Sequence, residues 1–195
     1  MKTIQLTAIA VAAGVSTTDA QTAWKLDPMH SQVTFSVTHM VISEVAGNFK
    51  KFDAEISTKG EDYSDAAIAF NIDVNSINTN SDMRDNHLKS DDFFNSEKFP
   101  QIKFKASSMK KTAGNKYELK GMMTIRDITK PVVFDVVYGG TVVDPYGNTR
   151  SGFKVDGSIN RFDYGLKWNS MIEAGGAVVG DIVSFSANLE LTKVK

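Results

Sequence analysis

Apolar and polar residues alternate with a period of two along most of this chain, from residue 24 to its end. The pattern is plain at Val33, Phe35 and Val37, which are separated by hydroxyl side chains. Because successive side chains of a β-strand point to opposite faces, such alternation predicts strands with one buried face. Seven segments show it clearly, and an eighth is expected over 47–56 despite a break in parity at Phe49; the seven are 33–37, 68–74, 102–106, 117–125, 132–136, 153–159 and 183–191.

The connections between these segments are short and rich in turn-forming residues. Examples are Ala113-Gly114-Asn115 and the stretches 144–148 and 59–62. Strands that follow one another so closely favour an antiparallel sandwich or barrel. About eight strands can close into a barrel without exposed edges, and its interior is either filled by side chains or holds one elongated ligand. Periodicity alone leaves both interiors open.

Small residues interrupt the bulky set on the expected inward face. They are Gly121, Gly157, Ala106 and Ala187, each on a different predicted strand. Small side chains at inward positions leave space, so a partly hollow interior is an expectation of the sequence.

Two segments break the strand pattern. Residues 81–89 combine a possible N-cap with Asp82 and Asp85, acidic side chains that suit the first turn of a helix. A short helix is therefore predicted over 81–89, with 91–94 as its last turn or exit. Residues 167–180 contain Trp168 and several glycines and are expected to form a long loop or a single helical turn.

The first twenty residues have the composition of a secretory signal peptide. Lys2 precedes a mostly apolar run, which ends in the small residues of Thr18-Asp19-Ala20. Cleavage is expected after Ala20, with Ala23 as the alternative site, leaving 21–195 as a single exported domain. The competing interpretation is an amphipathic helix belonging to the mature fold. The run is too short for a comfortable transmembrane helix.

Composition argues against several classes of protein. With 22 basic and 23 acidic residues the net charge is −1, which offers no electrostatic basis for nonspecific nucleic-acid binding. The absence of cysteine excludes disulfide scaffolds, thiolate metal sites and cysteine nucleophiles. His30, His39 and His87 have no metal-ligand spacing, and no Gly-x-Ser-x-Gly motif is present. Neither a metal, a cofactor nor a catalytic residue is predicted.

The predicted helix carries two polar side chains three residues apart, Arg84 and His87. Beside a barrel mouth they would be candidates, with Trp168 of the irregular stretch, to contact the polar head of a ligand. The alternative role for Arg84 is structural, because a guanidinium that bonds carboxylates or loop carbonyls would pin the helix to the barrel.

An ordered set of motifs covers residues 24–195. They are Asp27-Pro28-Met29-His30-Ser31 leading to Val33-Thr34-Phe35 and His39; Phe49 and Phe52; Arg84-Asp85-Asn86-His87-Leu88 with Asp92-Phe93-Phe94; Phe99-Pro100-Gln101-Ile102; 121–132; Ile159-Asn160-Arg161-Phe162-Asp163-Tyr164-Gly165; and Gly180-Asp181. In these motifs the chain resembles the YceI-like family of exported polyisoprenoid-binding proteins. Asp127 and Tyr164 depart from the family pattern, where Gly and Phe are usual, and neither change touches the apolar face.

The resemblance implies an extended, lipocalin-like antiparallel barrel in the periplasm, without catalytic residues. Its interior would carry or sequester a long isoprenoid lipid, such as a polyprenyl phosphate or ubiquinone. A transient membrane contact and a homodimer are further expectations of this kind of barrel. The residues expected to line the tunnel are Val33, Phe35, Val37, His39, Phe70, Ile72, Phe104, Leu119, Met123, Phe134, Val136, Phe153, Val155, Phe185 and Leu189.

Two other classes of function remain open from the sequence. One is a secreted β-domain with a filled core that acts through protein partners. The other is an enzyme that handles isoprenoids on the same scaffold, although the sequence shows neither a redox centre nor a base paired with a nucleophile.

Overall fold

The computed structural model describes residues 21–60, 62–64, 66–171 and 175–195. The predicted signal peptide, 1–20, lies outside the described residues. Within them, nearly all regular structure is β-strand. The strands are β1 (Thr22–Leu26), β2 (Gln32–His39), β3 (Ser43–Phe49), β4 (Phe52–Thr58), β5 (Ala67–Asp73), β6 (Ile77–Asn78), β7 (Gln101–Ala113), β8 (Lys116–Ile125), β9 (Ile128–Val143), β10 (Thr149–Asn160) and β11 (Val179–Lys193).

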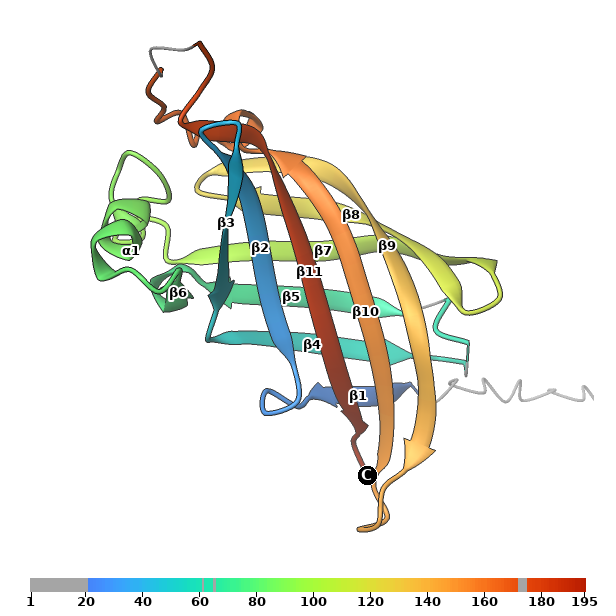
Figure 1. Ribbon diagram of the computed structural model, residues 1–195. Coiled ribbons are helices and arrows are strands. Elements are labelled where there is room, and N and C mark those ends of the chain that lie inside the picture. Colours follow the sequence, from blue (N-terminus) through green and yellow to red (C-terminus); the bar gives the residue numbers. More distant parts are fainter. Residues whose placement is uncertain (1–20, 61, 65, 172–174) are drawn as a thin grey trace, which may run out of the picture.

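Eight strands close into an antiparallel barrel (Figure 1). Around the barrel their order is β1, β4, β5, β7, β8, β9, β10 and β11, and β1 then pairs with β11 to complete the ring. Closure leaves no free edge among these strands, which removes the usual site of edge-to-edge aggregation. The eight-stranded antiparallel barrel expected from the sequence is confirmed.

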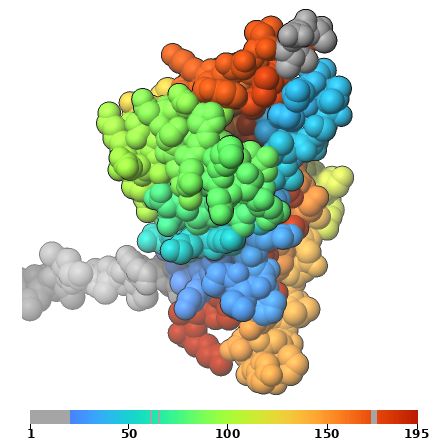
Figure 2. Space-filling model, turned by 60° about the vertical axis from the view of Figure 1, so that its left-hand side comes forward, coloured from blue at the N-terminus to red at the C-terminus, as the bar shows by residue number. Residues whose placement is uncertain are grey.

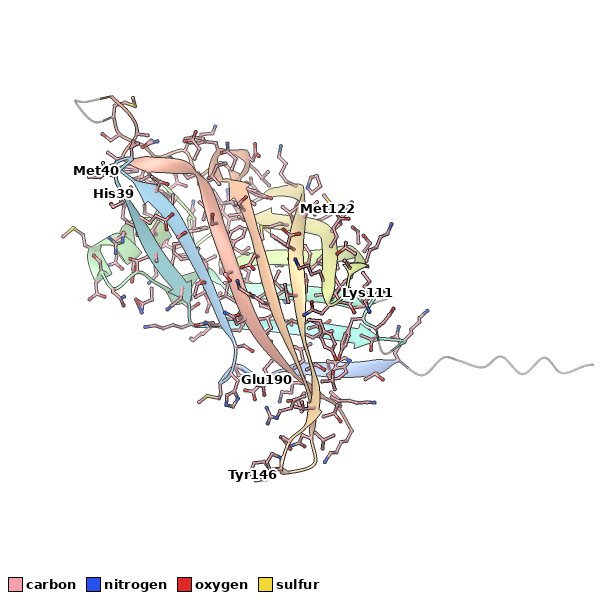
Figure 3. The ribbon with its side chains drawn as sticks, turned by 45° about the vertical axis from the view of Figure 1, so that its right-hand side comes forward. His39, Met40, Lys111, Met122, Tyr146 and Glu190 are labelled. Carbon is pink, nitrogen blue, oxygen red and sulfur yellow. The ribbon has the colours of Figure 1, made fainter. Side chains whose placement is uncertain are left out.

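Strand β11 changes partner along its length. Near its C-terminal end Leu191 to Lys193 pair with β1, whereas Val179 to Asn188 pair with β2. Strand β2 pairs in turn with β3, and β3 with the short β6, so these three strands extend the sheet beyond the closed ring. Figure 3 places His39 and Met40, at the end of β2, and Tyr146, at the β9–β10 turn, at opposite ends of the molecule.

The predicted single strand over 47–56 is wrong. The chain forms two strands there, because β3 ends at Phe49 and β4 begins at Phe52. Between them the Lys50 amide donates to the carbonyl of Ser76 at 3.1 Å, and the Lys51 amide donates to the Ser76 hydroxyl at 3.0 Å. The break in parity at Phe49 therefore marked a boundary between two strands.

The predicted helix is confirmed as α1 (Asp82–Lys89), with Ser81 as its N-cap. Its side chains hold it to the preceding segment: the buried carboxylate of Asp85 accepts hydrogen bonds from the backbone and the hydroxyl of Thr79, at 2.9 and 2.5 Å. In the described part of the chain no helix has the length and apolar character needed to cross a membrane.

The described residues of the irregular stretch before β11, 167–171 and 175–178, form a loop, one of the two predicted alternatives, with one isolated bridge between Met171 and Ala177; residues 179 and 180 belong to β11. The loop follows a 3-10 helix, η2 (Arg161–Tyr164), and Arg161 organises it from inside. This guanidinium is 2% exposed and donates to the carbonyls of Leu166, Trp168, Val179 and Gly180 at distances of 2.5 to 3.2 Å. A second 3-10 helix, η1 (Val74–Ser76), links β5 to β6.

Candidate functional site

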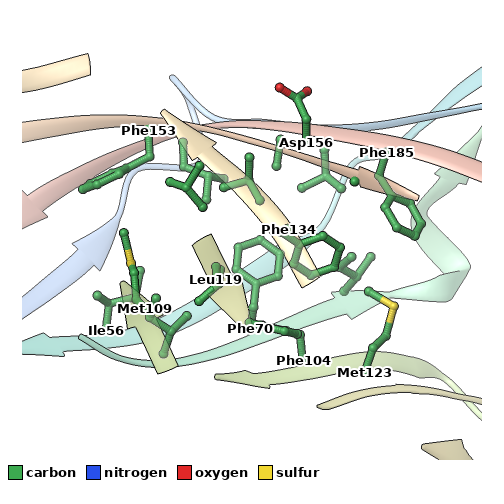
Figure 4. Close-up of a pocket in the computed structure, with 18 of the residues that line it drawn as sticks. Ile56, Phe70, Phe104, Met109, Leu119, Met123, Phe134, Phe153, Asp156 and Phe185 are labelled. Carbon is green, nitrogen blue, oxygen red and sulfur yellow. The ribbon is translucent and has the colours of Figure 1, made fainter. Parts of the chain in front are cut away.

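The barrel encloses an apolar cavity (Figure 4). About 140 Å³ of it can be reached by the centre of a water molecule. Along β8 the lining runs from Leu119 to Ile125, a distance of about 20 Å at the usual rise of a strand. The cavity is therefore elongated, with walls made by almost every strand of the barrel.

The cavity wall presents almost no polar atoms to the interior. Asp156 contributes to the lining, but its carboxylate points away from the cavity (Figure 4), where it accepts from Ser186 at 2.7 Å and pairs with Lys154 at 3.0 Å. Burial disfavours its ionisation, but these two partners outweigh that effect and lower the pKa of Asp156. Thr34 likewise donates its hydroxyl to the carbonyl of Ser186, at 3.0 Å. Such an interior suits a hydrocarbon and offers no site for a charge.

Most of the residues predicted for the inner face do line this cavity. Their inward position follows from the period of two, which holds along the predicted segments of these strands. The predicted residues found in the lining are Val33, Phe70, Ile72, Phe104, Leu119, Met123, Phe134, Val136, Phe153, Val155, Phe185 and Leu189.

Three predicted residues, Phe35, Val37 and His39, do not line the cavity. Strand β2 lies outside the closed ring, and only its first residues, Val33 and Thr34, reach the cavity; the three residues lie farther along it. Phe35 packs instead against Phe49, with ring centroids 5.5 Å apart. The alternation of β2 is intact, so the error lies in assuming that the whole strand belongs to the barrel.

The partly hollow interior expected from the small inward residues is present, but the position directly above each glycine of the closed barrel wall is filled. The space above Gly121 is taken by the ring of Phe104, and the space above Gly157 by the ring of Phe134. These rings lie against the wall of the barrel and contact each other, with centroids 5.3 Å apart. The glycines thus hold aromatic rings flat, and the free space lies beyond them toward the barrel centre.

One end of the cavity is closed by aromatic side chains around Tyr63. Its ring packs against Trp24, Tyr138 and Phe153, with centroids 5.5, 5.4 and 4.9 Å away. The Tyr63 hydroxyl is paired with that of Ser151 at 2.6 Å, so its polar atom is satisfied inside this plug. Burial raises the pKa of Tyr63. A ligand must therefore enter elsewhere.

Tyr63 and its neighbour Ala66 are cavity residues that the sequence reasoning missed. Both lie in the connection between β4 and β5, where alternation carries no information. Tyr63 has a positive φ of 59°, a conformation rare for an aromatic residue. The available signal was its bulk, unusual in a polar turn segment. Met109 was also missed: it lies beyond the predicted segment 102–106, past a bulge between Ala106 and Ser108 that shifts the alternation, whereas the missed Leu191 ends its predicted strand.

The side of the molecule around α1 is hollowed at its surface. Figure 2 shows a depression where α1, the β2–β3 hairpin and the segment before β11 meet, with the dark red of β11 visible at its base. Three residues on this side of the molecule were predicted to contact a polar head group: Arg84 and His87 of α1, and Trp168, whose ring contacts His87.

Arg84, His87 and Trp168 do not line the cavity. Arg84 donates to the hydroxyl and the carbonyl of Thr79, at 2.7 and 2.6 Å, so its role is structural, but it holds α1 to the connection after β6 and not to the barrel. His87 bonds Asp92 at 2.8 Å and meets the ring of Trp168 edge-on, with centroids 5.0 Å apart. Only Trp168 borders an open feature, a separate polar surface hollow that Arg126 also lines.

A cluster of charged groups lies at the end of the barrel that carries the C-terminus. Ligand atoms of Asp27, His30 and Glu190 lie within 4.8 Å of one another, as in a metal site. Arg150, however, donates to both carboxylates, at 2.7 and 2.5 Å, and also to Asp144 at 2.7 Å. The carboxylates are thus engaged in ion pairs, and the cluster ties β1, β10 and β11 together where the ring closes.

This arrangement perturbs the acid–base properties of its members. Hydrogen bonds from His30 and Arg150 hold the pKa of Asp27 well below its usual value of 3.8. Arg150 and the backbone amide of Asn148 do the same for Asp144. Hydrogen bonding to Asp27 raises the pKa of His30 above its usual 6.5. The cluster lies on the outside of the barrel, and none of its residues lines the cavity.

Comparison with known proteins agrees with this architecture. The family model of the YceI-like domain matches residues 24–191. UPF0312 protein SAB2563 of Staphylococcus aureus (strain bovine RF122 / ET3-1) is 36% identical over 172 residues, which cover 88% of this chain and 98% of the relative.

Solved structures show the same fold. Burkholderia cenocepacia BcnA superposes with a TM-score of 0.74 at 22% identity, over 85% of this chain and 98% of BcnA. The Campylobacter jejuni YCEI protein gives 0.70 at 30% identity, over 81% and 90%. A polyisoprenoid binding domain from Saccharophagus degradans gives 0.65 at 16% identity, over 88% and 98%. With a family match over nearly all of the barrel and a curated relative above 30% identity, this chain belongs to the YceI-like family.

Proposed function

We propose that the protein binds the tail of a long isoprenoid lipid inside its barrel and carries or sequesters that lipid without chemical change. The observation that carries the proposal is the elongated cavity, whose lining is apolar and whose polar atoms are turned outward or satisfied. The Saccharophagus degradans domain of the same fold, described as polyisoprenoid-binding, supports the same ligand class.

Burial of hydrocarbon supplies the driving force. Each CH₂ group removed from water contributes about 0.8 kcal/mol, so a tail of about fifteen carbons gains on the order of 10 kcal/mol before the cost of ordering it. The reachable volume of 140 Å³ corresponds to roughly ten water molecules at about 10–15 Å³ each. The cavity thus fits a few isoprene units, and a longer tail would continue along Phe35 and Val37 of β2.

The polar head of such a lipid would remain outside the closed barrel. The cavity offers no partner for a phosphate or a quinone, and its Tyr63 end is plugged. The surface depression beside α1 and the β2–β3 hairpin is where we place the entrance (Figure 2). Polyprenyl phosphate and ubiquinone both satisfy these requirements, because the head would make few contacts with the protein.

The predicted signal peptide supports a periplasmic site of action, where a water-insoluble tail needs a carrier between membranes. A lipid held this way must be taken from a bilayer, so transient contact with a membrane is part of the proposal. A homodimer remains a prediction without a supporting observation among the described residues.

Filling the cavity should weaken lipid binding at least tenfold while the protein still folds. Ala187 of β11 lines the cavity, so the ring introduced by Ala187→Phe would occupy the part of the cavity that the lipid tail is proposed to fill. Ile182, on the same strand, is 53% exposed, and Ile182→Phe is the matched control. We titrate delipidated protein with the fifteen-carbon prenyl alcohol farnesol. The wild type and Ile182→Phe should bind it, and Ala187→Phe should lose at least tenfold in affinity.

Equal farnesol affinity in all three folded proteins would contradict the proposal, because the ligand would then lie outside the cavity. Failure of the wild type to bind farnesol or any longer prenyl lipid would instead favour a β-domain that acts through protein partners.

A further inference from the structure

Phe134 occupies a central place in the cavity wall. It lies on β9, is 7% exposed, and contacts Phe104 on one side and Phe185 on the other, with centroids 5.3 and 6.1 Å away. Figure 4 shows its ring among the cavity-lining side chains. A displacement of this ring therefore changes the width of the cavity near its middle.

The ring of Phe134 is seated directly over Gly157 of β10. A Cβ atom at Gly157 would clash with Cδ1 of Phe134 and lie 2.8 Å from its Cε1, and the next nearest atom is Cγ of the same ring at 3.5 Å. Its nearest neighbours are thus ring atoms alone. Any side chain at this position must lift the Phe134 ring toward the centre of the cavity.

The other glycine of the closed barrel wall that lies under a ring, Gly121, differs in one respect. A Cβ at Gly121 would meet the Phe104 ring and also the backbone carbonyl oxygen of Lys105, at 2.5 Å. A substitution there strains the sheet itself. Gly157 also has no φ in the positive range, so its backbone accepts an alanine. A substitution at Gly157 therefore changes the shape of the cavity without straining the backbone of the sheet.

We infer that Gly157 is a specificity-determining residue. Because it has no side chain, the Phe134 ring lies against the barrel wall, and the cavity stays wide enough for a methyl-branched chain. The inference rests on the proposed function and deepens it by naming what selects the tail. An isoprenoid carries a methyl branch on every fourth carbon of its main chain, so its cross-section exceeds that of a linear alkyl chain. A narrower cavity excludes the branched chain first.

The test compares two ligands of equal carbon number, farnesol and 1-pentadecanol, on delipidated full-length protein. Gly157→Ala should weaken farnesol binding about tenfold, while 1-pentadecanol binding changes by less than about threefold. The matched control is Gly152→Ala on the same strand, where an added Cβ meets nothing within 4 Å. This control should bind both ligands as the wild type does.

A second variant separates the width of the cavity from damage to the fold. The double substitution Gly157→Ala with Phe134→Leu replaces the ring by a smaller side chain and should restore farnesol affinity to within about threefold of wild type. Thermal unfolding of each variant checks that it is folded before it is titrated.

Several results would overturn the inference. One is an unchanged farnesol affinity in folded Gly157→Ala; another is an equal loss for both ligands; a third is no recovery in the double variant. If the wild type binds 1-pentadecanol but not farnesol, the proposed isoprenoid ligand is wrong and the inference falls with it. If the wild type binds farnesol and only the variants behave otherwise than predicted, the inference is wrong and the proposed function stands.

Discussion

At the scale of single residues, Arg150 shows how the barrel is closed. Its guanidinium joins Asp27 at the end of β1, Asp144 at the β9–β10 turn and Glu190 on β11. These three carboxylates come from segments far apart in the sequence, so one cation bridges the point where the first and last strands meet. Arginine suits this position because its planar fork of donors can serve several carboxylates at once.

The stability contributed by Arg150 should depend on pH in a defined direction. The folded-state pKa values of Asp27 and Asp144 lie below the usual 3.8, so their contribution is present above about pH 4 and is lost as the pH falls further. Arg150→Gln should lower the Tm at pH 7, and the difference from wild type should shrink below pH 4.

Thermal unfolding followed between pH 3 and pH 8 checks this prediction. Lys154→Gln serves as the control, because its ion pair with Asp156 is about half exposed and contributes little. A difference between Arg150→Gln and wild type that stays constant down to pH 3 would show that the ionisation of these carboxylates is irrelevant.

At the scale of elements, the β2–β3 hairpin combines a strained turn with an exposed apolar tip. Met40 and Val41 have φ values of 52° and 66°, and the amide of Ile42 donates to the carbonyl of His39 at 3.2 Å. A β-turn with positive φ at both central residues normally carries Asn-Gly there, and a β-branched residue is a rare exception. Val41 and Ile42 are nevertheless 66% and 86% exposed.

Val41→Gly should therefore stabilise the protein. The left-handed conformation costs a residue with a Cβ about 1–2 kcal/mol, and glycine returns about 0.5–1 kcal/mol of that through its greater entropy in the unfolded chain. A net gain of about 0.5–1 kcal/mol in unfolding free energy is expected from urea denaturation. Val142→Gly, at a position 64% exposed in β9 without positive φ, should destabilise instead. Equal losses from both substitutions would disprove the strain at Val41.

At the scale of the whole molecule, alternation predicted which side chains face the barrel interior along the regular parts of the closed ring, but not at Met109, which follows a bulge in β7. Leu119 and Phe134 are examples, since each is inward on a strand flanked by two barrel partners. Phe35 and Val37 show the limit of the method. Their strand pairs with β11 outside the closed ring and reaches the cavity only at its start, and such a long-range pairing leaves no trace in the period of β2.

Other features depend on contacts between distant residues. Tyr63 closes one end of the cavity from a loop, and its neighbours Trp24 and Phe153 are far from it in sequence. The Phe134 ring of β9 lies over Gly157 of β10. From the sequence of β10 alone, this glycine indicates empty space, although a ring from the neighbouring strand fills it. Composition and period thus predicted the class of fold and most of the lining, whereas the shape of the cavity required the three-dimensional packing.

The central claim is that the barrel holds an isoprenoid tail, and native mass spectrometry of the protein isolated from the cells that produce it tests this most directly. The account predicts a mass above that of the polypeptide, which organic solvent removes and chromatography identifies as a prenyl lipid. A mass equal to the bare polypeptide, together with no uptake of added ubiquinone or polyprenyl phosphate, would contradict it.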